Sequence, residues 1–493
     1  MWLLRTDTAK LVYFAEPPPK YAILSHVWNI QEQLFHELLE LHVTLPSNVN
    51  PRSKASSKVR DCCIYAESQG FEWLWIDTCC IDKRSTTELS EAISSMYRWY
   101  ARATVCYVYL QDVPTEDYNV AGEDSSFRKS RWFTRGWTLQ ELIAPSVVHF
   151  LSMQWKLLGT KVLLSKLLAD ITGINVDVLT FARPVQSLSV SCRMSWASRR
   201  LTTRVEDEAY SLMGLFDVHI PTIYGEGRGA FRRLQEEIMR SSPDYSLFLW
   251  GRSHTFPSMG NRHLSNSRLR LSDYISPLET ERDVPTRNIW DPTPISYSAH
   301  ARNLLAESPA DFEGTNHIKL RPAELLHHAL REEQVFWESA RLDRPDVPNV
   351  PLPDIQDLTH VPELSFTSIG IRAHLPVLDC GGTGVFLAIV AYGVHDYADD
   401  DPRCVVPVLV HRKPADVGKD GLLLSFSACP LPLLCIRSVL GIRDAGGDIG
   451  RKSVQWTSGL RMNTLQVSWA RGSSAQCQCG SGRTYTSHDS YRP

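Results

Sequence analysis

The sequence has no long run of apolar residues. No stretch of the 493-residue chain approaches the roughly 20 apolar residues that a membrane-spanning helix needs. The apolar run that follows Met1 is also too short for a secretory signal peptide. We therefore expect a soluble, cytoplasmic protein that has no membrane partner.

An excess of charge of one sign is also missing. Lys and Arg number 52, and Asp and Glu number 55, which leaves a formal net charge of -3. No basic stripe is interleaved with aromatic residues, although nucleic-acid binding depends on basic surfaces that neutralise phosphates. The charge balance therefore argues against nucleic acid as a partner.

Cysteines at zinc-ligand spacing are scarce. The twelve Cys are scattered, and Cys477 and Cys479 have no second pair nearby. Others, such as Cys62, Cys63 and Cys106, lie within apolar runs, which is typical of small buried residues. We expect no metal site.

Hydrophobic residues make up 43% of the chain, which is enough for about two to four globular domains. In the first 155 residues, short apolar strands alternate with helical patterns, and this alternation is typical of a parallel sheet with helices on both faces. The expected strands are 21–25, 73–76, 104–110 and 147–150, and the expected helices are 54–69, 86–100 and the segment that ends at Pro145.

The remaining chain divides by its residue pattern. Residues 156–250 are mainly helical in pattern, and residues 251–362 form an irregular region with a Pro-rich stretch at 345–362. Short apolar runs between turn residues predict a β-rich domain at 363–471, and a Ser/Gly-rich tail at 472–493 is expected to be disordered.

Polar residues stand where the expected strands end. Ser25 and His26 end the first strand, and Asp77 follows the second. Because ligands bind beyond the carboxyl ends of parallel strands, these residues are expected to converge on one crevice. Glu141 follows Trp137 by one helical turn, so we expect it beside that indole, partly shielded from water.

Three segments resemble the motifs of the fungal heterokaryon incompatibility (HET) domain. They occur in the order and spacing of that family, and the similarity covers roughly residues 1–250. Lys83, where many members have Gln, and Cys79, where many have Leu, depart from the pattern. The segments are Tyr21-Ala22-Ile23-Leu24-Ser25-His26-Val27-Trp28, Trp73-Leu74-Trp75-Ile76-Asp77-Thr78-Cys79-Cys80-Ile81-Asp82-Lys83 and Arg131-Trp132-Phe133-Thr134-Arg135-Gly136-Trp137-Thr138-Leu139-Gln140-Glu141-Leu142.

HET domains are distant relatives of Toll/interleukin-receptor (TIR) domains, so the resemblance implies a TIR-like α/β domain at 1–155 with a helical extension at 156–250. It also implies a role in non-self recognition and programmed cell death. For such a role we expect self-association through the HET domain and an upstream recognition protein.

In TIR domains, the Glu of a Trp-Cys-x-x-Glu motif serves NAD hydrolysis. The segment from Trp137 to Glu141 has the same spacing, with Thr138 in place of the Cys. The resemblance therefore maps the catalytic Glu onto Glu141 and makes NAD a small-nucleotide substrate, with no resident cofactor. The residues expected to bind it are Ser25, His26, Trp28, Asp77, Asp82, Arg135 and Trp137.

A structural interpretation stands beside each of these roles. Glu141 can pair with Arg135 or another Arg and fasten its helix, and the protein is then a non-enzymatic HET signalling and interaction module. Asp77 and Asp82 can cap turns. In the same way, His26 can fix a turn, Ser25 can cap the next helix, and Trp28 can belong to the core or its rim.

Two further motifs have competing interpretations. Cys80 could act as a nucleophile only with a histidine partner, and His26 is the plausible one. The run Tyr224-Gly225-Glu226-Gly227 could be a phosphate loop. Because its glycines do not follow a strand and no Lys-Ser/Thr ends it, we favour a tight turn before a helix at 229–240.

Overall fold

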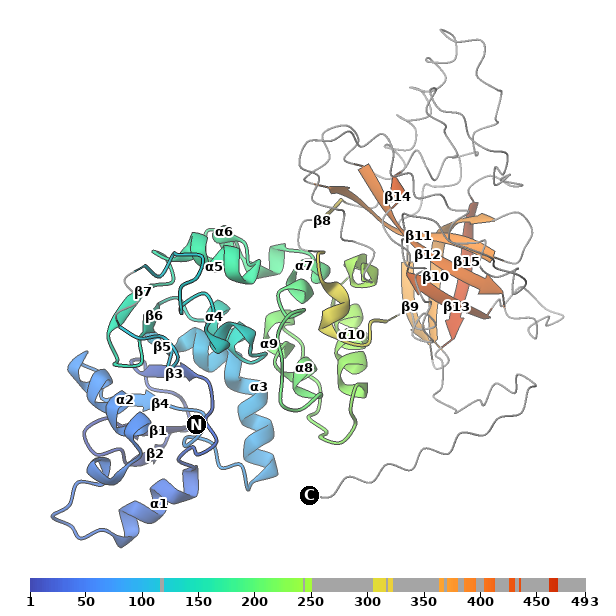
Figure 1. Ribbon diagram of the computed structural model, residues 1–493. Helices are drawn as coiled ribbons and strands as arrows, with labels where there is room; N and C mark the ends of the chain where they lie inside the picture. Colours follow the sequence, from blue (N-terminus) through green and yellow to red (C-terminus); the bar gives the residue numbers. More distant parts are fainter. Residues whose placement is uncertain are drawn as a thin grey trace, which may run out of the picture.

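The computed structural model describes residues 1–115, 119–242, 244–250 and 305–315, together with the backbone of the strands between 318 and 468. Figure 1 shows an α/β part at the N-terminus, a run of helices and a second, β-rich part. The irregular residues 251–304, the Pro-rich stretch 345–362, the tail 472–493 and the pair Cys477 and Cys479 lie outside the described residues.

The first part is built on a seven-stranded sheet with the order β2-β1-β4-β3-β5-β6-β7. The four strands at β4-β3-β5-β6 run parallel to one another, and β1, β2 and β7 join as antiparallel edges. The strands are β1 (Trp2–Arg5), β2 (Leu11–Tyr13), β3 (Ala22–His26), β4 (Trp73–Trp75), β5 (Val105–Tyr109), β6 (Val148–Leu151) and β7 (Leu157–Thr160).

The four parallel strands are those that the sequence predicts. The edge strands were not predicted, because they have only three or four residues each and are partly exposed. A short strand with one solvent-exposed face lacks the continuous apolar run that is typical of a buried parallel strand. The α/β fold with flanking helices is therefore confirmed, with a mixed sheet where a parallel one was expected.

Helices cross between the parallel strands on both sides of the sheet. Helices α1 (Phe35–Thr44) and α2 (Ser57–Ser68), with the 3-10 helix η1 (Pro51–Lys54) between them, link β3 to β4. Helix α3 (Thr86–Arg102) links β4 to β5 and lies on the opposite side of the strands from α2 (Figure 1). The strand order thus reverses between β3 and β5, and this is where open α/β sheets form their ligand crevice.

Helix α3 begins as its sequence predicts. The Ser85 hydroxyl accepts a hydrogen bond from the backbone N–H of Glu88 at 3.2 Å and caps the helix. The apolar stripe of α3 faces the core through Ala92, Ile93, Met96 and Tyr100, all of which are buried.

The third motif folds into two short helices between β5 and β6. They are the 3-10 helix η2 (Arg131–Thr134) and helix α4 (Thr138–Ile143), and every residue of α4 is buried. Lys161, which is 1% exposed, fixes the carboxyl end of α4, because its ammonium donates to the carbonyl oxygens of Leu142 and Pro145.

Helices then dominate as far as residue 250. One cluster of buried apolar side chains runs through both the sheet and these helices. Gly214 shows how closely the two parts pack, because a Cβ at that position would lie 2.2 Å from the Cβ of Tyr97 on α3. The elements are α5 (Ser165–Thr172), α6 (Val176–Leu179), η3 (Val185–Ser187), α7 (Val190–Ser195), α8 (Asp207–Tyr210), α9 (Met213–Phe216), α10 (Gly229–Ser241), η4 (Tyr245–Phe248) and η8 (Pro309–Phe312).

The C-terminal strands form a second sheet, as the short apolar runs between turn residues predict. Strands β10, β11, β12, β13 and β15 pair in succession, and β15 pairs again with β10, so the pairings close on themselves. The strands of this sheet are β8 (Ile318–Arg321), β9 (Glu363–Thr367), β10 (Gly370–Asp379), β11 (Val385–His395), β12 (Arg403–Arg412), β13 (Ser425–Pro430), β14 (Leu434–Cys435) and β15 (Arg461–Ser468).

Among the helices that the structure describes, none combines the length and apolarity needed to cross a membrane.

Candidate functional site

Three elements bring Ser25, Glu141 and Trp132 together in the interior. Strand β3 carries Ser25 near its carboxyl end, α4 carries Glu141, and η2 carries Trp132. The Ser25 hydroxyl donates to Glu141 Oε2 and accepts the indole N–H of Trp132 at 2.7 Å. Glu141 is 6% exposed, and the other two side chains are fully buried. We call these three residues the inner cluster.

Glu141 holds its proton unusually tightly. Burial raises its pKa from an ordinary value of 4.5 to about 8, and the negative charge of Asp77 adds to this effect. Hydrogen bonds from Ser25 and Tyr100 and the positive charge of Arg200 act in the opposite direction but do not outweigh burial. Near neutral pH, Glu141 is therefore mostly protonated in this closed arrangement.

No Lys, Arg or His of the described residues lies within ion-pair distance of the Glu141 carboxyl. Arg135, the expected partner, instead donates to Thr203 Oγ1 at 3.0 Å. Arg200 lies near the start of α4, where it donates to Thr138 Oγ1 and to the Arg135 carbonyl oxygen, both at 2.9 Å. The helix is thus fastened without neutralising Glu141.

A second group of side chains lies at the ends of β3 and β4. Asp77 Oδ1 lies 3.0 Å from His26 Nε2, and Asp77 Oδ2 accepts the indole N–H of Trp28 at 2.7 Å. The Lys58 ammonium lies 3.0 Å from His26 Nδ1 and also pairs with Glu32. If Lys58 donates to Nδ1, the proton of the ring is on Nε2 and faces Asp77. We call these five residues the outer cluster.

The two clusters contain neighbouring carboxyl groups whose pKa values are shifted in opposite directions. Burial alone would raise the pKa of Asp77, but hydrogen bonds and charge from His26, then Lys83 and Trp28, outweigh it and hold that pKa below its usual value. Burial and the negative charge of Asp77 raise the pKa of Glu141, which therefore keeps its proton. Environments that separate two carboxyl groups in this way are typical of sites that use one as an acid and the other as an anion.

Three of the expected site residues lie elsewhere. Asp82 Oδ1 accepts the backbone N–H of Arg84 at 3.0 Å, as expected if it caps a turn. Arg135 contacts Thr203, as described above. Burial raises the pKa of Asp207, and hydrogen bonds from Tyr224 and Trp137 partly offset this rise, so the indole of Trp137 is engaged with Asp207. The indole that reaches the inner cluster is that of Trp132.

The end of β5 also supports the inner cluster. Asp112, just beyond this strand, accepts hydrogen bonds at 2.8 Å from the Ser130 hydroxyl and from the backbone N–H of Arg131. These contacts fix η2, which carries Trp132. The ends of β3, β4 and β5 therefore all contribute, and Asp112 does so through the position of Trp132.

Several residues of this arrangement were absent from the sequence-based set. Trp132 could have been included, because it belongs to the same motif as Glu141. Lys58 lies on the helix before β4, and Arg200 follows α7; no local pattern connects either of them to a strand end.

The competing interpretations of Cys80 and the glycine-rich turn are also resolved. Cys80 Sγ lies 3.4 Å from the backbone N–H of Ile76, and both ring nitrogens of His26 face Lys58 and Asp77 instead. The backbone N–H groups of Gly225 and Gly227 donate to Glu206 Oε1 at 2.8 and 3.1 Å. A phosphate loop would need those N–H groups, so the segment is a tight turn before α10, as favoured above.

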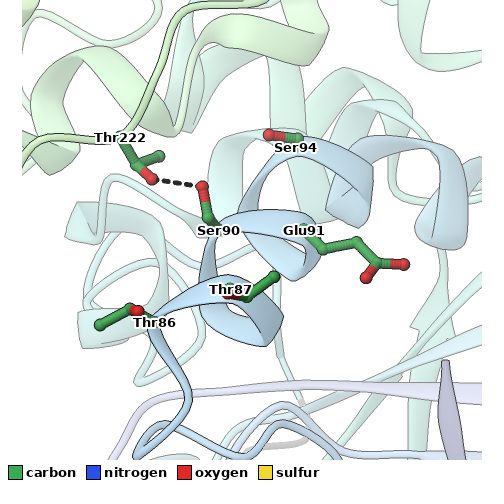
Figure 2. A pocket seen from close by; sticks show the side chains of 6 residues that line it. All are labelled: Thr86, Thr87, Ser90, Glu91, Ser94 and Thr222. Carbon is green, nitrogen blue, oxygen red and sulfur yellow. Dashed lines mark hydrogen bonds between the residues drawn. The ribbon is translucent and has the colours of Figure 1, made fainter.

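Two hollows lie along α3, away from Glu141. One, of about 480 Å³, is lined by Thr86, Thr87, Ser90, Glu91, Ser94 and Thr222, and Figure 2 shows the Ser90 and Thr222 hydroxyls meeting at 2.7 Å. The other, of about 210 Å³, reaches Trp2, Trp99 and Cys80. No group of three His, Cys, Asp or Glu side chains suited to a metal ion occurs in the part of the chain that the structure describes.

Comparison with known proteins identifies the family. The model of the heterokaryon incompatibility protein (HET) family matches residues 21–124. Over 226 residues, the chain is 46% identical to the vegetative incompatibility protein HET-E-1 of Podospora anserina. Residues 21–124 are a HET domain. The aligned region covers 45% of this chain but only 16% of that relative, so the chain spans a small part of the relative's length.

The HET match includes part of the site. Ser25, His26 and Asp77 lie within residues 21–124, whereas Trp132 and Glu141 follow it. A second family model, a domain of unknown function (DUF8212), matches residues 229–340 and crosses the boundary expected at 250, which stays a prediction along with the other domain limits. No solved structure matches the chain.

Proposed function

We propose that this HET-domain protein acts in heterokaryon incompatibility and that, once clustered, it cleaves the nicotinamide–ribose bond of NAD or a related nucleotide and thereby kills the cell. The observation that supports this most is the state of Glu141, which is buried, held by neutral donors and free of any ion pair in the described residues, at a reversal of strand order. A purely structural carboxylate usually has a cation or several backbone N–H donors.

The chemistry needs little more than one anionic carboxylate. As the C1′–N1 bond of NAD breaks, its electron pair stays on nicotinamide, which leaves as a neutral molecule. The ribose then carries oxocarbenium-like positive charge, which a carboxylate beside it stabilises. Water forms the new bond to C1′ and releases a proton to solvent, so the products are nicotinamide and ADP-ribose.

Glu141 would perform this step as its anion. Its pKa of about 8 means that it must lose its proton on binding substrate or at higher pH. The charge of Asp77 acts on Glu141, and His26 contacts Asp77, so we assign both residues to ribose binding. We therefore expect activity to rise as the pH increases through 8.

A second candidate function is a non-enzymatic HET module that passes a signal through contacts with other HET domains. The low exposure of Glu141, 6%, favours this alternative, because the carboxyl would then only fix α4 against β3. The two candidates differ in what an isosteric change at Glu141 does.

The deciding experiment compares the wild type with Glu141→Gln in a fungal host and as purified, artificially clustered protein. Growth and NAD are followed together, with Glu40→Gln on the exposed surface of α1 as the matched control. We expect Glu141→Gln to reduce NAD consumption by at least 100-fold and to abolish toxicity, whereas the control changes neither. Toxicity that survives the Glu141 change at equal protein level would establish the signalling module instead.

A further inference from the structure

The ammonium group of Lys83 is buried next to the outer cluster and has no hydrogen-bond acceptor in the described part of the chain. Its Nζ lies 3.6 Å from the centroid of the Trp28 ring. Buried polar groups are nearly always hydrogen-bonded, and buried charges are nearly always paired. An ammonium with three unused N–H donors at the edge of a candidate site therefore needs an explanation.

Lys58, a member of the outer cluster, shows the contacts of a paired lysine in this region. Its ammonium contacts Glu32, His26 Nδ1 at 3.0 Å and the Val27 carbonyl oxygen at 3.3 Å. Lys83 has no such set, and the two oxygens of the nearby Asp77 contact His26 and Trp28 instead. Burial lowers the pKa of Lys83, and the charges of Asp77, Cys79 and Glu32 only partly restore it.

Trp28 covers this ammonium. Its side chain is 46% exposed, and only one indole N–H bond, to Asp77, holds it in the described structure. A ring that is half in water and held by one hydrogen bond can turn away more easily than a core side chain. Its departure would expose the Lys83 ammonium where β3 and β4 end.

We propose that Lys83 is an anion-binding residue, which exchanges its contact with the Trp28 ring for the phosphate oxygens of a nucleotide. Charge-assisted hydrogen bonds from an ammonium to phosphate are stronger than a cation–π contact, so the exchange favours the ligand. The inference deepens the proposed function, since it assigns the pyrophosphate of the substrate to Lys83 and leaves the ribose to Glu141. Asp77, the nearest anion, keeps its bond to His26 and so opposes the added charge less than a free carboxylate would.

The test measures binding and needs no catalysis. Inorganic pyrophosphate and ADP are titrated into the full chain by calorimetry and by tryptophan fluorescence, for the wild type and Lys83→Met. Lys54→Met on the exposed end of η1 is the matched control. We expect saturable binding to the wild type and the control, and binding at least tenfold weaker in Lys83→Met. Lys83→Arg keeps the charge and should retain binding, which keeps the test informative if the Met variant folds poorly.

Trp28→Leu removes the competing ring and is expected to tighten pyrophosphate binding several-fold. The proposal is overturned if the wild type binds neither probe, or if Lys83→Met binds within twofold of the wild type. Pyrophosphate binding that depends on Lys83 in a protein that never consumes NAD would support the inference while rejecting the proposed function.

Discussion

Two buried glutamates of this chain are nearly equally hidden but behave in opposite ways. Glu141 is 6% exposed and Glu206 is 7% exposed. The pKa of Glu141 is raised to about 8 by burial. The pKa of Glu206 is lowered, because backbone N–H groups, its own first and then that of Gly225, favour its charged form.

The difference shows that burial alone does not decide what a carboxyl group does. Glu206 accepts hydrogen bonds from two backbone N–H groups of one loop, and these bonds hold the loop in place. The negative charge of Glu206 therefore stabilises the fold. Glu141 has a single serine hydroxyl as its closest donor, and burial outweighs that hydrogen bond, so the fold favours its neutral form. Glu206 is the structural carboxylate, and Glu141 is the one to which the proposed function gives a chemical role.

The largest expected effect concerns the stability of Glu141→Gln as a function of pH. The folded-state pKa of Glu141 is raised, so between about 4.5 and 8 the folded state keeps a proton that the unfolded state has lost. Stability of the wild type therefore falls as the pH rises through this window, by about 4 kcal/mol at the upper end. Glutamine does not titrate, so the variant should lose this dependence and gain on the wild type up to pH 8.

Chemical denaturation at several pH values measures the difference. Glu40→Gln, an exposed change on α1, should follow the wild type at every pH. Parallel curves for the wild type and Glu141→Gln would mean that Glu141 is ionised in the fold, and the contrast with Glu206 would disappear.

Glu206→Ala is expected to have the next largest effect, with the opposite sign. The change leaves the N–H groups of Gly225 and Gly227 without their acceptor, and both glycines have positive φ values, 104° and 60°, that this acceptor helps to hold. We expect a loss of about 3 kcal/mol in the free energy of unfolding at neutral pH.

Glu206→Gln should cost less than half as much as the Ala change, because its amide oxygen still accepts both bonds. Equal losses in the two variants would show that packing, and not the hydrogen bonds to the loop, makes Glu206 structural.

The third motif, residues 131–142, shows how much of the site could be predicted from its sequence. The order of strands and helices, the position of Ser25 at a strand end and a helix at Glu141 all follow from residue patterns. The spacing pointed to the indole of Trp137, which hydrogen-bonds Asp207, whereas the indole that contacts Ser25 is that of Trp132. Helix α4 has only six residues, and Trp137 stands at its first turn, where tertiary contacts with the 200–207 segment decide its direction.

Long-range contacts explain most of what the patterns missed. Residues 134–136 pair with Leu201 through backbone hydrogen bonds of 2.7 and 2.9 Å, and Gly136 fits only because it has no Cβ to meet Thr202 at 2.4 Å. Arg200 reaches α4 from the same segment. No local period links residues more than 60 positions apart, so these partners could not be read from one sequence.

Ser25→Ala removes the single hydroxyl between Trp132 and Glu141 and is expected to have the smallest effect. The Ser25 hydrogen bond lowers the pKa of Glu141, so its removal should raise that pKa further and extend the pH range over which stability falls. It also leaves the Trp132 indole N–H without its acceptor, at a cost of about 1 to 2 kcal/mol. Ser246→Ala is the matched control, because that buried hydroxyl accepts the Ser191 N–H at 2.9 Å and contacts no carboxyl group among the described residues. Both variants should lose similar stability, but only Ser25→Ala should move the titration. An identical pH profile in the two would mean that Ser25 holds only the indole, and that its hydroxyl does not lower the pKa of Glu141.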